Sequence, residues 1–189
     1  GEAETMHPDL AGRVDAFFAY GGLEHAYDEH SHGTHCAGIV AGNAATGEVD
    51  ENGALYGLGV APAAHLVAQR IFDGVGDYYP PESFEKLTRD AVRSGAVVGS
   101  NSWGDESQGQ YDLSAAEFDA LVRDADAQTP GEQPYILEFS AGNSGPGRYT
   151  INSPAVSKNV LATGSCDNSR YEFVIYADGP EVTSDFSSR

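Results

Sequence analysis

Short apolar runs alternate with helical stretches along most of this 189-residue chain. The predicted strands are residues 13–20, 64–72, 96–101, 134–141 and 159–165, and the predicted helices are residues 32–42, 82–94 and a stretch around 114–125. Several of these strands are apolar throughout, which is typical of a parallel sheet covered on both faces, and residues 96–101 are expected to form a buried strand. The alternation therefore predicts an α/β fold with helices on both faces of a parallel sheet, and the length suits one domain.

Two of the predicted helices carry recognisable end signals. Pro81 precedes residues 82–94 and Gly95 follows them, the asymmetry expected at a helix start and end. In the next helix, Ser114 and Glu117 have the spacing of a capping box.

The chain is strongly acidic, with a formal charge of -19 at pH 7. Such a surface repels phosphate, so nucleic acid is not an expected partner, whereas divalent cations or a salty medium would suit it. No apolar run approaches the ~18 residues of a membrane span, so no membrane contact is expected. No signal peptide is visible, so the chain is either intracellular or trimmed. Cys36 and Cys166 are too few for a disulfide framework.

The stretch "EHSHGTHCAGIVAG", residues 29–42, combines histidines with small residues inside a predicted helix. Ser31 is a good N-cap, which places His32 in the first turn. His35 and Cys36 follow on the same side of the helix as His32. The small residues form a face against which another element can pack directly: Ala37, Gly38, Ala41 and Gly42.

One hypothesis for these histidines is a metal site, because His30, His32 and His35 resemble the H-x-H-x-D-H pattern of metallo-hydrolases. That pattern needs an acid where Thr34 stands and further histidines downstream, and no histidine follows His65.

A second hypothesis is an α/β-hydrolase triad, in which "SNSWG" would be the nucleophile turn with Ser102 as the nucleophile. That fold places its histidine after the serine in the chain, and here all histidines precede Ser102. A third hypothesis is a triad in the order Asp, His, Ser, with the histidine early.

The third hypothesis has specific support in motifs that occur in one order along the chain. They are "HPDL" (7–10), "HSHGTHCAGIVAG" (30–42), "GVAPAAHLVAQRIF" (59–72), "SNSWG" (100–104), "SAGNSGPG" (140–147), "NSPAVSKNVLATGS" (152–165) and "DFSSR" (185–189). In order and approximate spacing, the chain resembles the subtilases, the subtilisin-like serine proteases, and within them the large alkaline members with an additional β-domain. The resemblance implies a three-layer subtilisin-like fold, secretion, polypeptide substrates and no required cofactor.

The resemblance also assigns roles to individual residues. His32 matches the general base of the Asp-His-Ser triad. Asn143 matches the asparagine that stabilises the oxyanion. His35 matches a buried structural histidine, and Cys36 is expected to be a free, buried thiol below His32.

Further residues match the substrate cleft of this family. Ser102, Trp103 and Gly104 match the segment that pairs with the substrate as an added strand, and Trp103 would either contact substrate or cover the core. Ser140, Ala141 and Gly142 match the opposite wall of the pocket, and Asn152 is expected near its base. The Ser153–Pro154 bond matches a position that is often cis.

Asp9 matches a calcium ligand of many subtilisins, which makes calcium a candidate structural ion. The other oxygen ligands would come from the loop after the histidine helix, which offers Asn43, Glu48, Asp50, Glu51 and Asn52. This loop differs from the family's in length and pattern.

The chain also departs from the family pattern. Residues 1–6 contain no D-[ST]-G motif and no later serine lies in a G-T-S-M-A motif. Residues 1–189 are therefore expected to be a partial peptidase domain, truncated after the catalytic Asp motif and before the catalytic Ser motif, and inactive alone. The alternative is a non-catalytic peptide-binding or interaction module that retains the cleft.

In this family the strand that bears the catalytic Asp lies between the strands matching 64–72 and 96–101. Without it, both strands have unpaired edges, and the chain is expected to dimerise or exchange strands.

Overall fold

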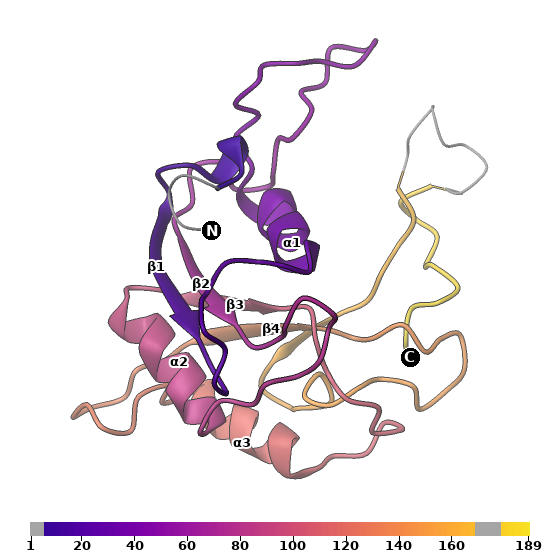
Figure 1. Ribbon diagram of the computed structural model, residues 1–189. Helices are drawn as coiled ribbons and strands as arrows, with labels where there is room; N and C mark the ends of the chain where they lie inside the picture. The colour runs from indigo at the N-terminus through magenta and orange to yellow at the C-terminus, as the bar shows by residue number, and fades with distance from the viewer. Residues whose placement is uncertain (1–5, 169–178) are drawn as a thin grey trace. The chain divides into compact units, whose positions relative to one another are not determined.

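The computed structural model describes residues 6–168 and 179–189, and the chain divides into two compact units, residues 1–96 and 97–189 (Figure 1). Each unit has its own parallel sheet, one of two strands and one of three. The predicted α/β class with parallel strands is confirmed.

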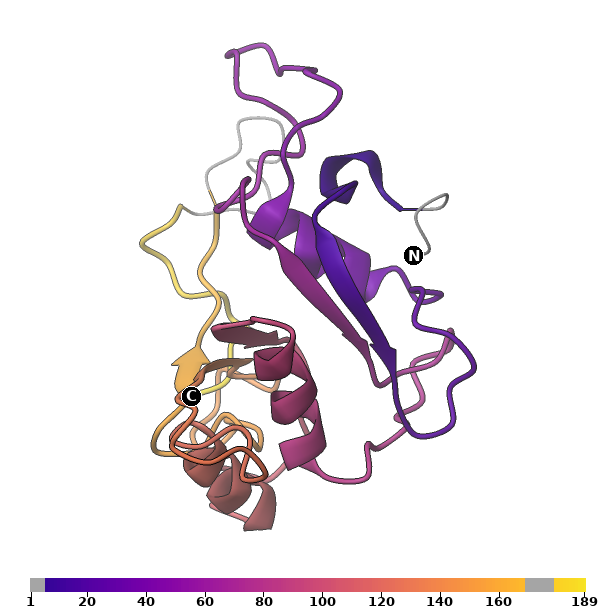
Figure 2. The ribbon, with the colours of Figure 1, turned by 90° about the vertical axis from the view of Figure 1, so that its left-hand side faces the viewer.

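The first unit pairs strand β1 (Val14–Ala19) with strand β2 (Leu66–Arg70), which run side by side in Figure 2. It also contains the 3-10 helix η1 (Pro8–Leu10), helix α1 (His32–Ala41) and helix α2 (Phe84–Arg93). All but η1 were predicted, with somewhat wider bounds. Its buried apolar side chains are Leu10, Tyr20, Ala41, Ala44, Ile71, Leu87 and Ala91.

Partly buried polar contacts join helix α2 to the sheet of the first unit. The Gln69 amide donates to the Tyr20 hydroxyl at 2.7 Å and to the Leu87 carbonyl at 2.8 Å. Burial raises the pKa of Tyr20, so the hydroxyl keeps its proton and donates to Asp90. The helix ends before Gly95, whose φ of +88° favours glycine at a helix C-terminus.

The small residues of α1 do permit a close approach, as the sequence predicted, and the partner is the segment 57–61. The Gly59 N–H donates to the Gly42 carbonyl at 2.7 Å, and the Ala61 N–H donates to the Val40 carbonyl at 2.7 Å. A methyl group on Gly59 would lie 2.7 Å from the Gly38 carbonyl oxygen. Only glycine at this position allows the two backbones to meet.

The second unit contains strands β3 (Val98–Asn101), β4 (Ile136–Ser140) and β5 (Leu161–Thr163) in the order β3-β4-β5, with helix α3 (Leu113–Leu121). Phe118 of α3 packs edge-on against Phe139 of β4, with ring centroids 4.9 Å apart. Both rings are buried and form the centre of this core.

Two predictions about the second unit were wrong. Strand β3 is not buried, since Val98 is 52% exposed at an edge of the sheet. Helix α3 does not begin with a capping box at Ser114. Its N-cap is Asp112, two residues earlier, whose carboxylate accepts the Ala115 N–H at 2.9 Å and the Ser153 hydroxyl at 2.6 Å.

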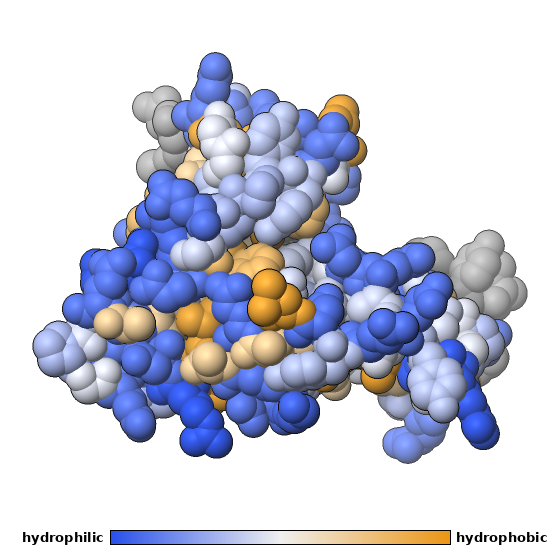
Figure 3. Space-filling model, turned by 90° about the horizontal axis from the view of Figure 1, so that it is seen from below, coloured by the Kyte–Doolittle hydropathy of each residue, from blue (hydrophilic) through white to orange (hydrophobic). Residues whose placement is uncertain are grey.

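Among the described residues, β2 pairs only with β1 and β3 only with β4. Each of these two strands therefore has an edge without a ladder partner in the described part of the chain. No helix within residues 6–168 and 179–189 has the length and hydropathy needed to cross a membrane. The face of the chain drawn in Figure 3 is mostly hydrophilic, with small hydrophobic groups between polar side chains.

Candidate functional site

His32 is the first residue of α1, and its position depends on how that helix begins. Ser31 occupies the N-cap position, but it has a left-handed φ of 72° and its side chain caps nothing. The Asp28 carboxylate does this instead, accepting the N–H groups of His30 at 2.9 Å, Ser31 at 2.8 Å and Thr34 at 2.7 Å. Ser31 thus occupies the predicted N-cap position, but the side chain that caps the helix is that of Asp28.

The electrostatics of Asp28 follow from these bonds. Partial burial favours the protonated acid, but the N–H groups of Thr34, Ser31 and His30 outweigh it and lower the pKa of Asp28 below its ordinary value. The charged carboxylate therefore stabilises the positive end of the helix from which His32 projects.

The imidazole of His32 is exposed to solvent, as a general base that meets a substrate must be. The Cys36 sulfur lies 3.9 Å from each of its ring nitrogens, so the thiol is beside the imidazole, as predicted. Cys36 is free but only half-buried. His35 is exposed, not buried, because α1 packs through its C-terminal small residues on segment 57–61 and leaves this side uncovered.

In the second unit, predicted cleft residues from separate segments meet. The Asn152 N–H donates to the Ala141 carbonyl at 3.1 Å, and the Asn152 amide nitrogen would lie 2.6 Å from a methyl group on Gly142. Gly104 packs against the same segment, since a methyl group there would lie 2.7 Å from the Ser153 carbonyl oxygen. Three separate stretches of the sequence thus contact one another, with little room for side chains at Gly104 and Gly142.

The remaining cleft residues differ in exposure. Ser102 is exposed and Ser140, at the end of β4, is half-buried. Trp103 packs edge-on against the Phe139 ring at 5.4 Å, and its indole N–H donates to Asn101 at 3.1 Å. Of the two hypotheses for Trp103, the structure favours the one in which it covers the core.

Asn143 lies beyond the end of β4 with its side chain exposed. Within residues 6–168 and 179–189 its amide has no hydrogen-bond partner, so its donors are free to meet a ligand. Both neighbours of Asn143 are held by Ser188, whose N–H donates to the Gly142 carbonyl and whose hydroxyl accepts the Ser144 N–H, each at 3.1 Å. The bonds Gly145–Pro146 and Ser153–Pro154 are cis, the second as predicted.

Asp9 holds a loop in place. Its side chain is largely buried and accepts the Ala45 N–H at 2.7 Å, while its second carboxylate oxygen lies against Gly57. No group of three or more His, Cys, Asp or Glu side chains in the described part of the chain could hold a metal ion. These side chains do not form a calcium cage, so calcium at Asp9 stays a prediction from the resemblance.

Comparison with known proteins identifies the family. The protein-family model described as "Subtilase family" matches residues 3–189. The chain is a subtilase. Among curated relatives, serine protease AprX of Bacillus subtilis is 31% identical over 97% of this chain, which spans 40% of AprX. Minor extracellular protease Vpr of the same organism is 26% identical over 91% of this chain, which spans 20% of Vpr.

The fold is also similar to that of a solved structure. The solved structure of Sphericase aligns with a TM-score of 0.67 at 24% identity, over 97% of this chain and 55% of Sphericase. The subtilisin-like fold predicted from the motifs is therefore confirmed.

Two residues that hold segments of the candidate site in place were not predicted from the sequence. Asp28 lies three residues before Ser31, and an acid just upstream of a helix start could have signalled a cap. Ser188 lies in the "DFSSR" motif, but nothing in the motif indicates that it contacts the loop of Asn143.

Proposed function

We propose that this chain is part of a serine endopeptidase that acts on polypeptides through an Asp-His-Ser triad. The observation that carries the proposal is His32, an exposed imidazole at the first residue of a helix that is capped by Asp28. The family match over residues 3–189 supports it. Secretion is part of the proposal, and it is supported by the extracellular relative Vpr.

In the proposed reaction, His32 takes the proton of the serine hydroxyl as the hydroxyl attacks the peptide carbonyl, and returns it to the leaving amine. The Asn143 amide donates a hydrogen bond to the oxyanion. The backbone of Ser102–Gly104 pairs with the substrate as an added strand, opposite the wall formed by Ala141, Gly142 and Asn152. The catalytic Asp and Ser belong to parts of the peptidase domain outside residues 1–189.

Two measurements test this function. The intact protein that carries this chain should be labelled by a phosphonofluoridate and should cleave peptide anilides, and His32→Ala should reduce kcat by several orders of magnitude. The 189-residue polypeptide alone should show neither labelling nor cleavage. Labelling of a serine within residues 1–189 would contradict the assignment.

The second candidate is a peptide-binding module without catalysis, which is favoured by the close backbone contacts at Gly104 and Gly142 among the predicted cleft residues. Calorimetry with peptides separates the two functions. Binding by an intact protein that neither cleaves nor is labelled would support the module.

A further inference from the structure

Arg70, the last residue of β2, has a side chain that is only 8% exposed, and each of its three guanidinium nitrogens donates at least one hydrogen bond. Its Nε donates to the Phe72 carbonyl at 2.8 Å. Its Nη1 donates to the Tyr27 carbonyl at 2.9 Å and to His25 Nδ1 at 2.8 Å. Its Nη2 donates to Glu29 at 2.6 Å. One buried cation thus binds three residues of the loop that precedes α1.

The contact with His25 defines the state of that ring. Arginine can only donate, so His25 Nδ1 must be an acceptor, and the proton of the neutral ring is on Nε2, 3.6 Å from Glu29. The His25 ring stacks on Tyr27 with centroids 3.4 Å apart and an interplanar angle of 10°, and the Arg70 guanidinium lies 5.9 Å from the Tyr27 centroid. The loop is therefore held by directional bonds and by stacking.

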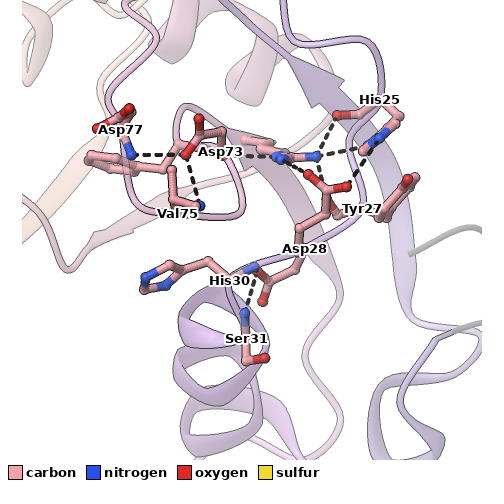
Figure 4. A network of polar contacts seen from close by, with 11 residues as sticks. His25, Tyr27, Asp28, His30, Ser31, Asp73, Val75 and Asp77 are labelled. Carbon is pink, nitrogen blue, oxygen red and sulfur yellow. Dashed lines mark hydrogen bonds and ion pairs between the residues drawn. The ribbon is translucent and has the colours of Figure 1, made fainter.

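This loop carries Asp28, whose carboxylate caps helix α1. Asp28 lies between two residues bound by Arg70, and Figure 4 shows its carboxylate beside the backbone of His30 and Ser31. His32 directly follows Ser31 and is the first residue of α1. Any displacement of the Tyr27–Glu29 backbone moves the Asp28 carboxylate and, with it, the N–H groups that begin α1.

A turn after β2 supports the same loop from another side. The Asp73 carboxylate accepts the N–H groups of Val75 and Asp77, each at 2.9 Å, which closes the turn (Figure 4). A methyl group on Gly74 would lie 3.0 Å from Glu29 Cβ, and one on Gly76 would lie 3.4 Å from His30 Nε2. Arg70 also binds the Phe72 carbonyl at the start of this turn. It therefore contacts both the turn and the His25–Glu29 loop.

We propose that Arg70 is a positioning residue for His32: it braces the His25–Glu29 loop, which holds Asp28 in place at the start of α1. The catalytic part rests on the proposed peptidase function, whereas the structural part does not. Lysine cannot replace Arg70, because its single ammonium group lacks the planar fork that reaches acceptors on both sides.

The structural test uses nuclear magnetic resonance on Arg70→Met, Arg70→Lys and the control Arg13→Met. Arg13 is also a half-buried arginine of the first unit that binds carbonyl groups, those of Ala64 and Asp9, but within the described residues it makes no hydrogen bond to the loop. In Arg70→Met we expect amide exchange at Ser31 and Thr34 to accelerate about tenfold more than exchange in β1. The nitrogen shifts of His25 should also lose the signature of an accepting Nδ1. Arg13→Met should change neither.

The catalytic test uses the intact protein that carries this chain. Arg70→Met should lower kcat about ten- to hundredfold with little change in KM and should shift the acid limb of the pH profile, because a misplaced base loses transition-state contact. Arg70→Lys should recover only part of kcat, and Arg13→Met should keep the wild-type profile.

These outcomes separate the two proposals. Unchanged exchange at Ser31 and Thr34 in Arg70→Met would overturn the bracing role, whether or not the protein is active. If exchange accelerates in a protein without peptidase activity, the bracing stands and the proposed function fails. If exchange accelerates but kcat and the pH profile match those of Arg13→Met, the loop is braced without positioning His32, and the proposal is overturned.

Discussion

Ser188 binds Ser144 across the loop that carries Asn143. The Ser144 N–H donates to the Ser188 hydroxyl at 3.1 Å, and the Ser188 N–H donates to the Gly142 carbonyl at the same distance. Since Ser188 is only 5% exposed, water cannot readily replace it. The exposed amide of Asn143 thus extends from a backbone that is held on both sides.

Replacing Ser188 tests this relationship. Ser188→Ala keeps the backbone bond and removes the hydroxyl acceptor, so the Ser144 N–H is left unsatisfied and the loop loosens. In the intact protein we expect kcat to fall about tenfold with KM little changed, a part of the 10²–10³ that losing an oxyanion donor costs. Ser184→Ala is the matched control, because Ser184 is also buried but bonds to Asp167 and Ser165. An equal loss in both variants would contradict the role of Ser188.

The Asp28 cap predicts a dependence of stability on pH. Because the pKa of Asp28 is lower in the folded protein than its ordinary value of 3.8, the unfolded chain takes up the proton more readily. The stabilisation by Asp28 is therefore complete above that value and disappears as the pH falls through the folded-state pKa. Asp28→Asn keeps an acceptor oxygen but loses the negative charge at the helix start, so it should cost about 0.3–1 kcal/mol near neutral pH.

Urea denaturation of wild type and Asp28→Asn at several pH values measures this effect. The free energies of unfolding of the two proteins should converge as the pH falls below 3.8. A difference that is the same at all pH values would exclude the carboxylate charge as its source.

The close contact between α1 and segment 57–61 predicts opposite effects for two glycines. Gly59→Ala places a methyl group 2.6 Å from the Gly42 nitrogen, so we expect it to destabilise the protein by about 1–3 kcal/mol. Gly38→Ala, inside α1, meets no atom within 4 Å outside its chain neighbours and its own helix backbone, and should stabilise by about 0.5–1 kcal/mol. Thermal melts of both variants provide the measurement, and a stable Gly59→Ala would show that the segment can move away.

The open edges of β2 and β3 predict self-association of the 189-residue polypeptide. Each strand has a ladder partner on one side only in the described residues, and such edges recruit further strands. Light scattering at micromolar concentration should show dimers or larger species. A monomer whose amides in β2 and β3 are fully protected from exchange would contradict this expectation.

The sequence determined the class of fold, and it supplied the candidate residues for the proposed site. Alternating strands and helices indicate a parallel sheet. The stretch that begins with "HGTH" and continues with small residues predicts a helix with His32 at its start. These features depend on local patterns within one segment, so they can be recognised without the fold.

The tertiary structure decided the supports of the site. Asp28 rather than the side chain of Ser31 caps α1, because the left-handed backbone of Ser31 turns the chain so that N–H groups on both sides of it face Asp28. Arg70 and Ser188 act on segments about 40 residues away in sequence, at Glu29 and Ser144. No local pattern encodes such contacts, because they form only when β2 or the C-terminal segment packs beside a distant loop.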